Sequence, residues 1–257
     1  MTAAYQETPV GASSPLQWVR ALSLRQRLLV LFFVELAYWI ATRLTLRYFP
    51  WNTLDAEFIR LALRSSTALM CWWLMRDLIC SQTPRPGEIA KLPVLFGITL
   101  LLGAGFTMQH PTFSPSMAIL FGVGSIAVAL KEEFLFRGVI QNLLQSRFGF
   151  AKAVLITTIV FTAWHYGAVP NTRLQYLQIV MASFAIGAIY VRTGNIWVVV
   201  ALHAGYDALF AFPTLVSYKY NDAIACLMLL GAVGCAFFRV RPAPSSTSHG
   251  ITVPVSQ

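Results

Sequence analysis

Long apolar stretches separated by short polar breaks make up most of the chain. A helix needs about 20 apolar residues to cross roughly 30 Å of hydrocarbon, and most of these stretches approach that length. The stretches predict eight helices, at about 28–46, 58–80, 93–108, 116–146, 152–168, 174–191, 196–212 and 222–238. We therefore predict an all-α fold, a polytopic membrane bundle of about eight transmembrane helices, or seven if one weak stretch is re-entrant.

Turn-forming residues mark the breaks between the apolar stretches. The breaks read TPRPGE, HPTFSPS, GAVPN, TGN and PTLVSYKYN, and they contain the Pro, Gly, Asn and Ser residues that turns use. The fourth stretch, 116–146, is too long for one simple span. We expect its second half to kink or to lie partly in the membrane interface.

The two ends of the chain are polar and contain Pro and Ser. We divide the chain into a flexible cytoplasmic N-terminal segment (1–27), N-terminal transmembrane helices (28–92), a membrane core (93–238) and a disordered cytoplasmic tail (239–257). The first apolar stretch has no small-residue cleavage site, so we expect a retained span and not a signal peptide.

Composition supports a membrane location. The 257 residues are 57% hydrophobic and 11% charged, with a mean hydropathy of +0.63, whereas soluble domains carry about a quarter charged residues. The net charge of +9 comes from basic residues clustered at the ends of apolar stretches, without the basic stripes or stacking platforms of a nucleic-acid-binding protein. Under the positive-inside rule these clusters place both termini in the cytoplasm, and we expect a bacterial plasma membrane.

Cysteine spacing indicates no metal site. The four cysteines, Cys71, Cys80, Cys226 and Cys235, form no CxxC pair and match no zinc-binding spacing. We expect them to be buried thiols that act as small hydrophobic side chains.

Ionisable residues inside apolar stretches are costly, and one cluster of them occurs in LKEEFLFRG (130–138). Glu133 and Arg137 are four residues apart on one helix face, where they can form an ion pair. Glu132 lies about 100° round the helix, so one carboxylate is left without full compensation. The alternative is the solvated, charged end of an ordinary helix at the cytoplasmic surface.

Two further polar groups lie on later helices. In FTAWHYG, Phe161 and His165 share one helix face, although His165 could also be a structural histidine that a backbone carbonyl satisfies. In LHAGYDALF, His203 and Asp207 are one turn apart, so that the aspartate can orient the imidazole. The alternative for this pair is a polar contact that ties two helices together.

These three groups can converge between the cytoplasmic half and the middle of the membrane, because their helices run in alternating directions. Two carboxylates and two imidazoles that face inward can hold and activate a water molecule, with one carboxylate as general base. The same groups can instead bind a divalent metal such as zinc, which would acidify its bound water. The candidate metal ligands are Glu132, His165, His203 and Asp207.

The motifs EEFLFR (132–137), FTAWH (161–165) and HAGYD (203–207) occur in this order on successive predicted helices. In order and placement they resemble the CPBP family, also called Abi or type II CAAX prenyl endopeptidase-like intramembrane proteases. The resemblance covers about 93–238, and it implies that this segment is a catalytic membrane core.

The resemblance implies a role for each motif residue. Glu132 would activate the water and Glu133 would assist it, while Arg137 would hold the two carboxylates. His165 and His203 would contact the water or a metal.

The last motif departs from the family pattern. It ends in Asp207, where much of the family has an asparagine thought to donate a hydrogen bond to the oxyanion. An ionised aspartate only accepts hydrogen bonds, so we expect Asp207 to orient His203, to bind a metal or to stay protonated. The family mechanism is open between a metalloprotease and a metal-free glutamate protease, and the chain has no HExxH motif.

The resulting expectation is an intramembrane endopeptidase that cleaves near the C-terminus of a membrane-associated, CAAX-like or lipid-anchored protein. Its partners would be a membrane-embedded protein or peptide substrate and the lipid bilayer, with no nucleic acid. Two alternatives stay open. One is a non-catalytic membrane scaffold, immunity or protein-sorting factor with the same fold, and the other is an ion or proton transporter that uses the buried acids and histidines.

The remaining charged residues are expected to be structural. Glu35 and Arg43 are eight residues apart on one face of the first helix, where they could contact neighbouring helices. Lys219 and Asp222 are expected to be loop charges, and Lys131 is expected to be incidental to the site.

Overall fold

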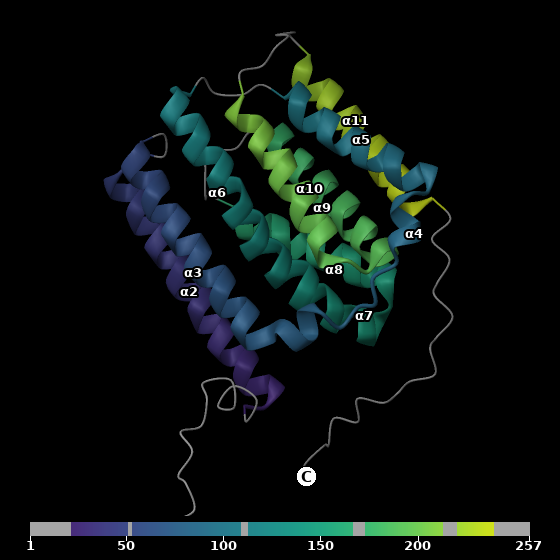
Figure 1. Ribbon diagram of the computed structural model, residues 1–257, viewed down its shortest axis with the longest axis horizontal. Helices are drawn as coiled ribbons and strands as arrows, with labels where there is room; N and C mark the ends of the chain where they lie inside the picture. Colours follow the sequence, from purple (N-terminus) through teal and green to yellow (C-terminus); the bar gives the residue numbers. More distant parts are fainter. Residues whose placement is uncertain (1–21, 51–52, 109–112, 167–172, 213–219, 239–257) are drawn as a thin grey trace, which may run out of the picture.

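The structure is a computed structural model that describes residues 22–50, 53–108, 113–166, 173–212 and 220–238 (Figure 1). These residues are helical, with short connections, and they contain no strand. The helices are α2 (Leu24–Tyr48), α3 (Leu54–Ile79), α4 (Pro86–Ile89), α5 (Leu92–Thr107), α6 (Pro115–Glu133), η1 (Phe134–Gln141), α7 (Asn142–Phe148), α8 (Phe150–His165), α9 (Arg173–Thr193), α10 (Ile196–Ala208), η2 (Leu209–Ala211) and α11 (Asn221–Phe237).

The predicted all-α fold is confirmed, and each of the eight predicted helices has a counterpart. The short helix α4 was not predicted. Most of the N-terminal segment 1–27, all of the tail 239–257 and Lys219 lie outside the described residues.

Polar caps fix where several helices begin. Ser23 and Gln26 form a capping box before α2, in which each side chain accepts a hydrogen bond from the other residue's backbone N–H. Ser114 and Asn195 accept from backbone N–H groups in the first turns of α6 and α10. Gly149, with φ of 76°, makes the tight turn from α7 to α8.

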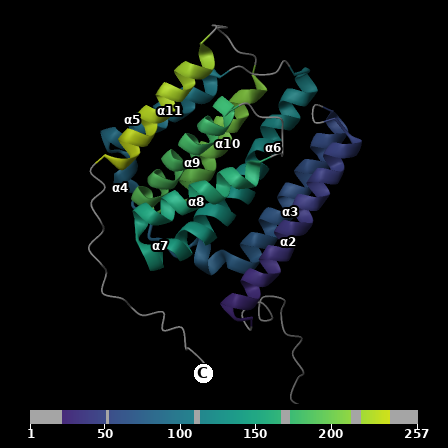
Figure 2. The same cartoon turned by 180° about the vertical axis from the view of Figure 1, so that it is seen from behind.

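The helices that carry the three motifs occupy the middle of the bundle. Figure 1 shows the pair α2 and α3 on one side and the pair α5 and α11 on the other, with α6, α9 and α10 between them. Helix α6 packs against both α3 and α10, and α9 packs against α8 and α11. Seen from behind in Figure 2, α7 and α8 cover the other face of this middle layer.

The long fourth stretch changes its hydrogen-bonding pattern at the motif. Helix α6 runs directly into the π-helical segment η1, which begins at the residue after Glu133, and then into α7. π-helical turns are rare and occur frequently at functional sites. The kink or interfacial position expected for this stretch stays a prediction, and the structure adds a change of hydrogen-bond register directly after the two adjacent glutamates.

Apolar side chains cover much of the outer surface. Helices α2 and α9 are long and apolar enough to cross a membrane, and α5, α8, α10 and α11 are shorter apolar helices. Phe32 on α2 is 61% exposed and Leu227 on α11 is 69% exposed. Wide exposed apolar faces are typical of proteins that contact lipid or partners. They indicate a helical membrane protein, while the number of eight spans stays a prediction.

A polar network around α4 holds one end of the bundle together. Arg85 donates hydrogen bonds from its side chain and its backbone to carbonyl groups in the last turn of α9. Glu88 binds both Lys91 and Arg192, and the hydrogen bond from Lys91 lowers the pKa of Glu88, with a further contribution from Arg192. Gly194 has a φ of 60°, and a Cβ there would collide with a carbonyl oxygen of the segment before α4.

We call this end, where α2 begins and α3 ends, the clasp end. The opposite end, where α8 and α10 end and α9 and α11 begin, is called the far end.

A buried ion pair joins the first helix to the motif helix. Lys131 Nζ lies 2.8 Å from Glu35 Oε2, and both side chains are buried. The Lys131 ammonium also lies 4.1 Å from the ring centre of Tyr38 and 4.8 Å from that of Trp164. The prediction that Lys131 is incidental is therefore wrong, and so is the alternative of a solvated helix end. The structural role predicted for Glu35 is confirmed.

A second buried ion pair lies within the first half of α3. Arg64 Nη1 lies 2.6 Å from Glu57 Oε1. Gly124 on α6 makes room for this carboxylate, because a Cβ there would come within 2.8 Å of Glu57 Oε1. The helix contact predicted for Arg43 is also confirmed, since its Nη2 donates to the Tyr166 carbonyl at 2.8 Å.

The cysteine prediction holds in part. Cys71 is buried, whereas Cys226 and Cys235 are half-buried and Cys80 is exposed. All four are free thiols.

Candidate active site

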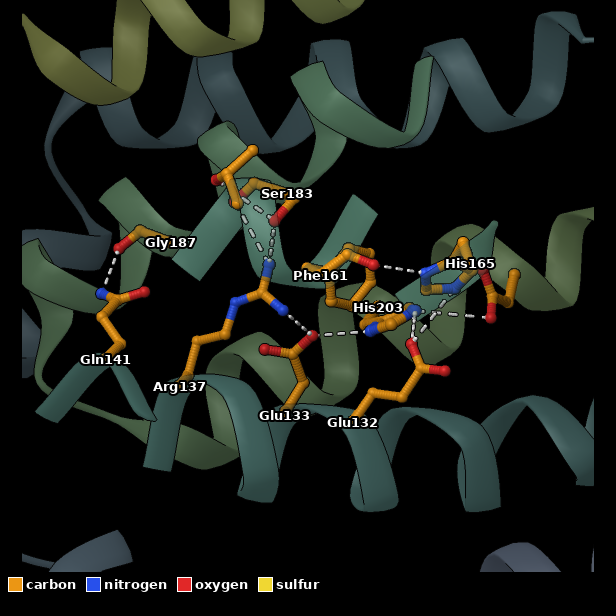
Figure 3. A network of polar contacts seen from close by, with 11 residues as sticks. Glu132, Glu133, Arg137, Gln141, Phe161, His165, Ser183, Gly187 and His203 are labelled. Atoms are coloured by element: carbon orange, nitrogen blue, oxygen red, sulfur yellow. Dashed lines mark hydrogen bonds and ion pairs between the residues drawn. The ribbon is translucent and has the colours of Figure 1, made fainter. Parts of the chain in front are cut away.

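A ladder of polar side chains runs along the motif helix and faces α9 (Figure 3). Its members Glu133, Arg137 and Gln141 are spaced by four residues and are fully buried. Arg137 Nη1 lies 3.2 Å from Glu133 Oε1, which confirms the predicted ion pair. Arg137 Nη2 donates to Ser183 Oγ at 3.0 Å, and Gln141 Nε2 donates to the Gly187 carbonyl at 3.0 Å. Because a buried charge without a partner is strongly destabilising, this ladder holds Glu133 firmly in place.

Glu133 also orients the first imidazole. Its Oε1 lies 2.6 Å from His203 Nδ1, and because a carboxylate accepts, we assign the proton to Nδ1. A carboxylate on one ring nitrogen fixes the ring and leaves the other nitrogen for chemistry. That nitrogen, Nε2, lies 3.5 Å from Asp207 Oδ2 and 3.9 Å from Glu132 Oε2. The short orienting contact therefore comes from Glu133, and not from Asp207 as the sequence suggests.

The second imidazole is oriented by its own helix. His165 Nδ1 lies 2.8 Å from the Phe161 carbonyl, which only accepts, so we assign the proton to Nδ1 here too. The His165 ring also lies 4.5 Å, centre to centre, from the Phe161 ring. Its Nε2 lies 3.7 Å from Glu132 Oε2. The backbone-carbonyl contact expected of a structural histidine is therefore present at Nδ1. The other ring nitrogen, Nε2, nevertheless faces Glu132.

Three acceptor atoms therefore converge on one point. They are Glu132 Oε2 and the Nε2 atoms of His165 and His203, with separations of 3.7 and 3.9 Å from the carboxylate. These separations exceed a direct hydrogen bond, and Glu132 Oε2 is buried without a hydrogen-bond partner among the described residues. Such a set of acceptors calls for a donor between them: a water, a proton on an imidazole, or a cation.

A cavity of about 220 Å³ opens beside these atoms. Met108, directly after α5, and side chains from α6, α8, α9, α10 and α11 form its wall. The side chains from these five helices are Val128, Glu132, Phe161, His165, Gln175, Gln178, Ile179, Ala182, Ser183, Ile186, His203, Tyr206, Asp207 and Asp222. Asp222 lies in the first turn of α11, so its prediction as a loop charge is wrong. Pockets with mostly apolar walls and a few polar groups are typical of ligand sites.

The metal prediction is not settled by these positions. As the side chains stand, the described residues contain no group of three or more His, Cys, Asp or Glu that could hold a metal ion. The chemistry of the donor set, two imidazoles and carboxylates, is nevertheless that of zinc sites. Glu132, His165, His203 and Asp207 therefore stay predicted ligands, and we derive no step through a metal.

Sequence reasoning missed the contribution of α9. Ser183 binds Arg137 and also donates to Thr158 Oγ1 on α8 at 3.3 Å, and Gly187 accepts from Gln141. The signal was present in the spacing, because Ser183 and Gly187 are four residues apart, as are the ladder residues that they bind.

Comparison with known proteins bears on the region that carries these residues. Residues 113–209 match the family model described as type II CAAX prenyl endopeptidase Rce1-like. The chain is also 36% identical over 87 residues to the uncharacterized protein YpbD of Bacillus subtilis (strain 168). That alignment covers 34% of this chain and 41% of YpbD, so the chain matches about two fifths of the length of this relative. No solved structure matches the chain.

The matched region contains all three motifs and runs from α6 to the end of α10. It is shorter than the segment 93–238 over which the motifs suggested a resemblance, so the outer parts of that segment stay a prediction. Residues 113–209 therefore match the type II CAAX prenyl endopeptidase Rce1-like family model in the region where the three motifs suggested the resemblance.

Proposed function

We propose that the protein is an intramembrane endopeptidase that hydrolyses a peptide bond near the C-terminus of a membrane-associated, CAAX-like or lipid-anchored protein. One observation carries the proposal: Glu132 Oε2 faces the Nε2 atoms of His165 and His203 at 3.7 and 3.9 Å beside a cavity. The Nδ1 atoms of both rings are engaged elsewhere. The family of residues 113–209 supports the same activity.

In the proposed reaction a water molecule lies between Glu132 and the two imidazoles. Glu132 takes one proton from this water as its oxygen attacks the carbonyl carbon of the peptide bond. The carbonyl oxygen becomes an oxyanion, and polar side chains that line the cavity stabilise the negative charge that develops on it. When the C–N bond breaks, Glu132 returns the proton to the leaving amine, so that the carboxylate is regenerated.

The buried ladder of Glu133, Arg137 and Gln141 holds the residues of this step in position. Glu133 holds His203 through Nδ1, and Arg137 balances the charge of Glu133. Of the two adjacent carboxylates, Glu132 lines the cavity and Glu133 does not. We therefore assign the base to Glu132, and a positioning role to Glu133 and Arg137.

We expect the Asp207→Asn variant to keep kcat within about tenfold of the parent, or ~1.4 kcal/mol in activation free energy. The reason is that Glu133, at 2.6 Å, orients His203, while Asp207 Oδ2 lies 3.5 Å from the other nitrogen. Steady-state turnover of a peptide substrate measures this. A fall of more than a hundredfold, with an unchanged melting temperature, would assign the Asp207 carboxylate a direct part in the chemistry.

The proposed activity is tested with purified protein and an internally quenched peptide that carries a prenylated cysteine three residues from its C-terminus. We expect cleavage of this peptide, and mass spectrometry of the products locates the broken bond. The same peptide without the prenyl group shows whether the lipid is recognised. Absence of cleavage of both peptides would contradict the proposal and favour the non-catalytic scaffold or sorting role.

A chelation arm of the same assay tests the metal. Loss of activity with chelator, and its return with added zinc, would support a metal held by Glu132, His165, His203 and Asp207. Full activity after chelation, with no metal found by elemental analysis, would discard the metal-assisted version.

A further inference from the structure

We propose that Gln178 is a further catalytic residue of the site. Its side-chain amide donates a hydrogen bond to the carbonyl oxygen of the scissile peptide bond and stabilises the oxyanion that forms there. This inference rests on the proposed function and names the group that receives the developing negative charge. Two observations carry it, the register of two parallel helices and the small number of available donors in the cavity wall.

Helix α9 runs parallel to α6 and η1 with a constant register. In the ladder Arg137 donates to Ser183, and the next contact, one turn along, also joins residues 46 positions apart (Figure 3). Residues on parallel helices that share this separation stand opposite each other, because the helices rise by nearly the same amount per residue. A separation of 46 positions therefore places Gln178 opposite Glu132.

Gln178 and Glu132 form facing walls of the cavity. Both side chains line it, and the two residues are only 3% and 7% exposed. On the clasp side the contact between Arg137 and Ser183 closes the space between the helices, and Ser183 is also part of the cavity wall. A carbonyl that is attacked by the water of Glu132 directs its growing negative charge away from this carboxylate, because like charges repel. The opposite wall, with Gln178, receives that charge.

Other polar side chains of the wall are acceptors or have their protons engaged. The ionised carboxylates only accept hydrogen bonds. The Nδ1 protons of the two imidazoles are bound to a backbone carbonyl and to Glu133. The hydroxyl of Ser183 donates to Thr158. The hydroxyl of Tyr206 donates to the sulfur of Met108 at 3.4 Å. The amide donors of the wall are its two glutamines.

Of these two glutamines, Gln178 has the better position. Gln175 lies about one turn nearer the far end and is less buried. The Nε2 atom of Gln178 carries two N–H groups. It donates to the Asp222 carbonyl at 3.3 Å, which is longer than a usual N–H···O hydrogen bond. It also contacts the thiol of Cys226, a weak acceptor. A negatively charged oxygen is a stronger acceptor than either of these groups.

The hydrogen bond from Gln178 to the substrate strengthens as the reaction proceeds. A hydrogen bond to an ionised acceptor is roughly twice as strong as one to a neutral acceptor. Only an interaction that is stronger in the transition state than in the ground state speeds the chemical step. Gln178 therefore acts on kcat and has little effect on KM.

Methionine in place of Gln178 removes both N–H groups and keeps the length of the side chain. We expect Gln178→Met to lower kcat by about 10²–10³-fold, the range for loss of one oxyanion donor. KM should stay within about threefold of the parent value, as for any interaction made only in the transition state. The measurement is steady-state turnover of the quenched, prenylated peptide.

Two further variants make this measurement specific. Gln145→Met is the same change at a half-buried position of α7 outside the cavity, and it should turn over like the parent. Gln178→Glu keeps the shape of the side chain but exchanges the donor for an acceptor, so it should lose at least as much kcat. It serves as the test if Gln178→Met does not fold. A parent-like kcat in a folded variant at position 178 would overturn the inference, whereas a parent enzyme that leaves the peptide uncleaved would contradict the proposed function itself.

Binding of two uncleavable peptides separates a catalytic role from a packing role. In one peptide a phosphinate replaces the scissile bond and mimics the tetrahedral oxyanion, and in the other a reduced CH2–NH bond has no oxygen at this place. We expect Gln178→Met to weaken binding of the phosphinate at least about tenfold and to leave binding of the reduced peptide within about twofold of the parent. Equal weakening of both peptides, with a lower melting temperature, would make Gln178 a packing residue and overturn the inference.

Discussion

Glutamine in place of Glu132 is expected to lower kcat by about 10²–10⁴-fold, the range that a positioned general base contributes. Glutamine keeps the size and the acceptor oxygen of the side chain but cannot take a proton. Glu132 is nearly buried, lines the cavity, and faces both imidazoles. No other carboxylate of the motif can replace it, because Glu133 is fully buried behind it, against Arg137 and His203.

The measurement is kcat for the quenched peptide together with the melting temperature of each variant. Glu88→Gln is the matched control, since Glu88 lies in α4 at the clasp end and is only partly buried. It should turn over like the parent. Glu133→Gln should lose activity and stability together, because it leaves Arg137 without its carboxylate. A Glu132→Gln protein that melts normally and turns over at the parent rate would remove Glu132 from the mechanism.

Methionine in place of Lys131 is expected to destabilise the protein by about 3–5 kcal/mol, the cost of leaving one partner of a buried ion pair alone. The partner is Glu35, which lies 2.8 Å away and is itself buried. The variant also loses the cation–π contacts of the ammonium with Tyr38 and Trp164. The free energy of unfolding in detergent, from a denaturant titration followed by tryptophan fluorescence, measures the loss.

Two variants make this measurement specific. Lys152→Met removes an exposed lysine from the first turn of α8, and it should change stability by less than about 0.5 kcal/mol. The double variant Glu35→Leu with Lys131→Met removes both charges and should recover most of the loss, because a buried pair can be replaced by apolar side chains at little cost. If Lys131→Met alone is as stable as Lys152→Met, the ion pair is not a structural element.

The helix positions could be predicted because the length of an apolar stretch translates directly into a helix in a membrane protein. The π-helical segment could not, since it differs from an α-helix in hydrogen-bond register, which hydropathy does not record. The length of the fourth stretch indicated that it is not one simple helix, but hydropathy did not show that η1 begins directly after Glu133.

The sequence predicted which residues of the candidate site lie close together, but not which of them contact each other. Glu132, His165 and His203 come from three helices and do converge. Their pairing was less predictable, because sequence spacing reveals contacts within one helix and not between helices. That is why His203 was paired with Asp207, its neighbour on α10, while the short contact of 2.6 Å comes from Glu133 on α6.

The ion pair between Lys131 and Glu35 sets a limit on what counts as a domain in this protein. The family match begins at 113, yet Glu35 on α2 neutralises a buried charge inside the matched region. A polypeptide cut before α5 would keep all three motifs and still carry an uncompensated lysine next to Glu132. The region that matches the family model therefore depends on α2 for one of its buried charges, and we expect it to be unstable when it is expressed without the first two helices.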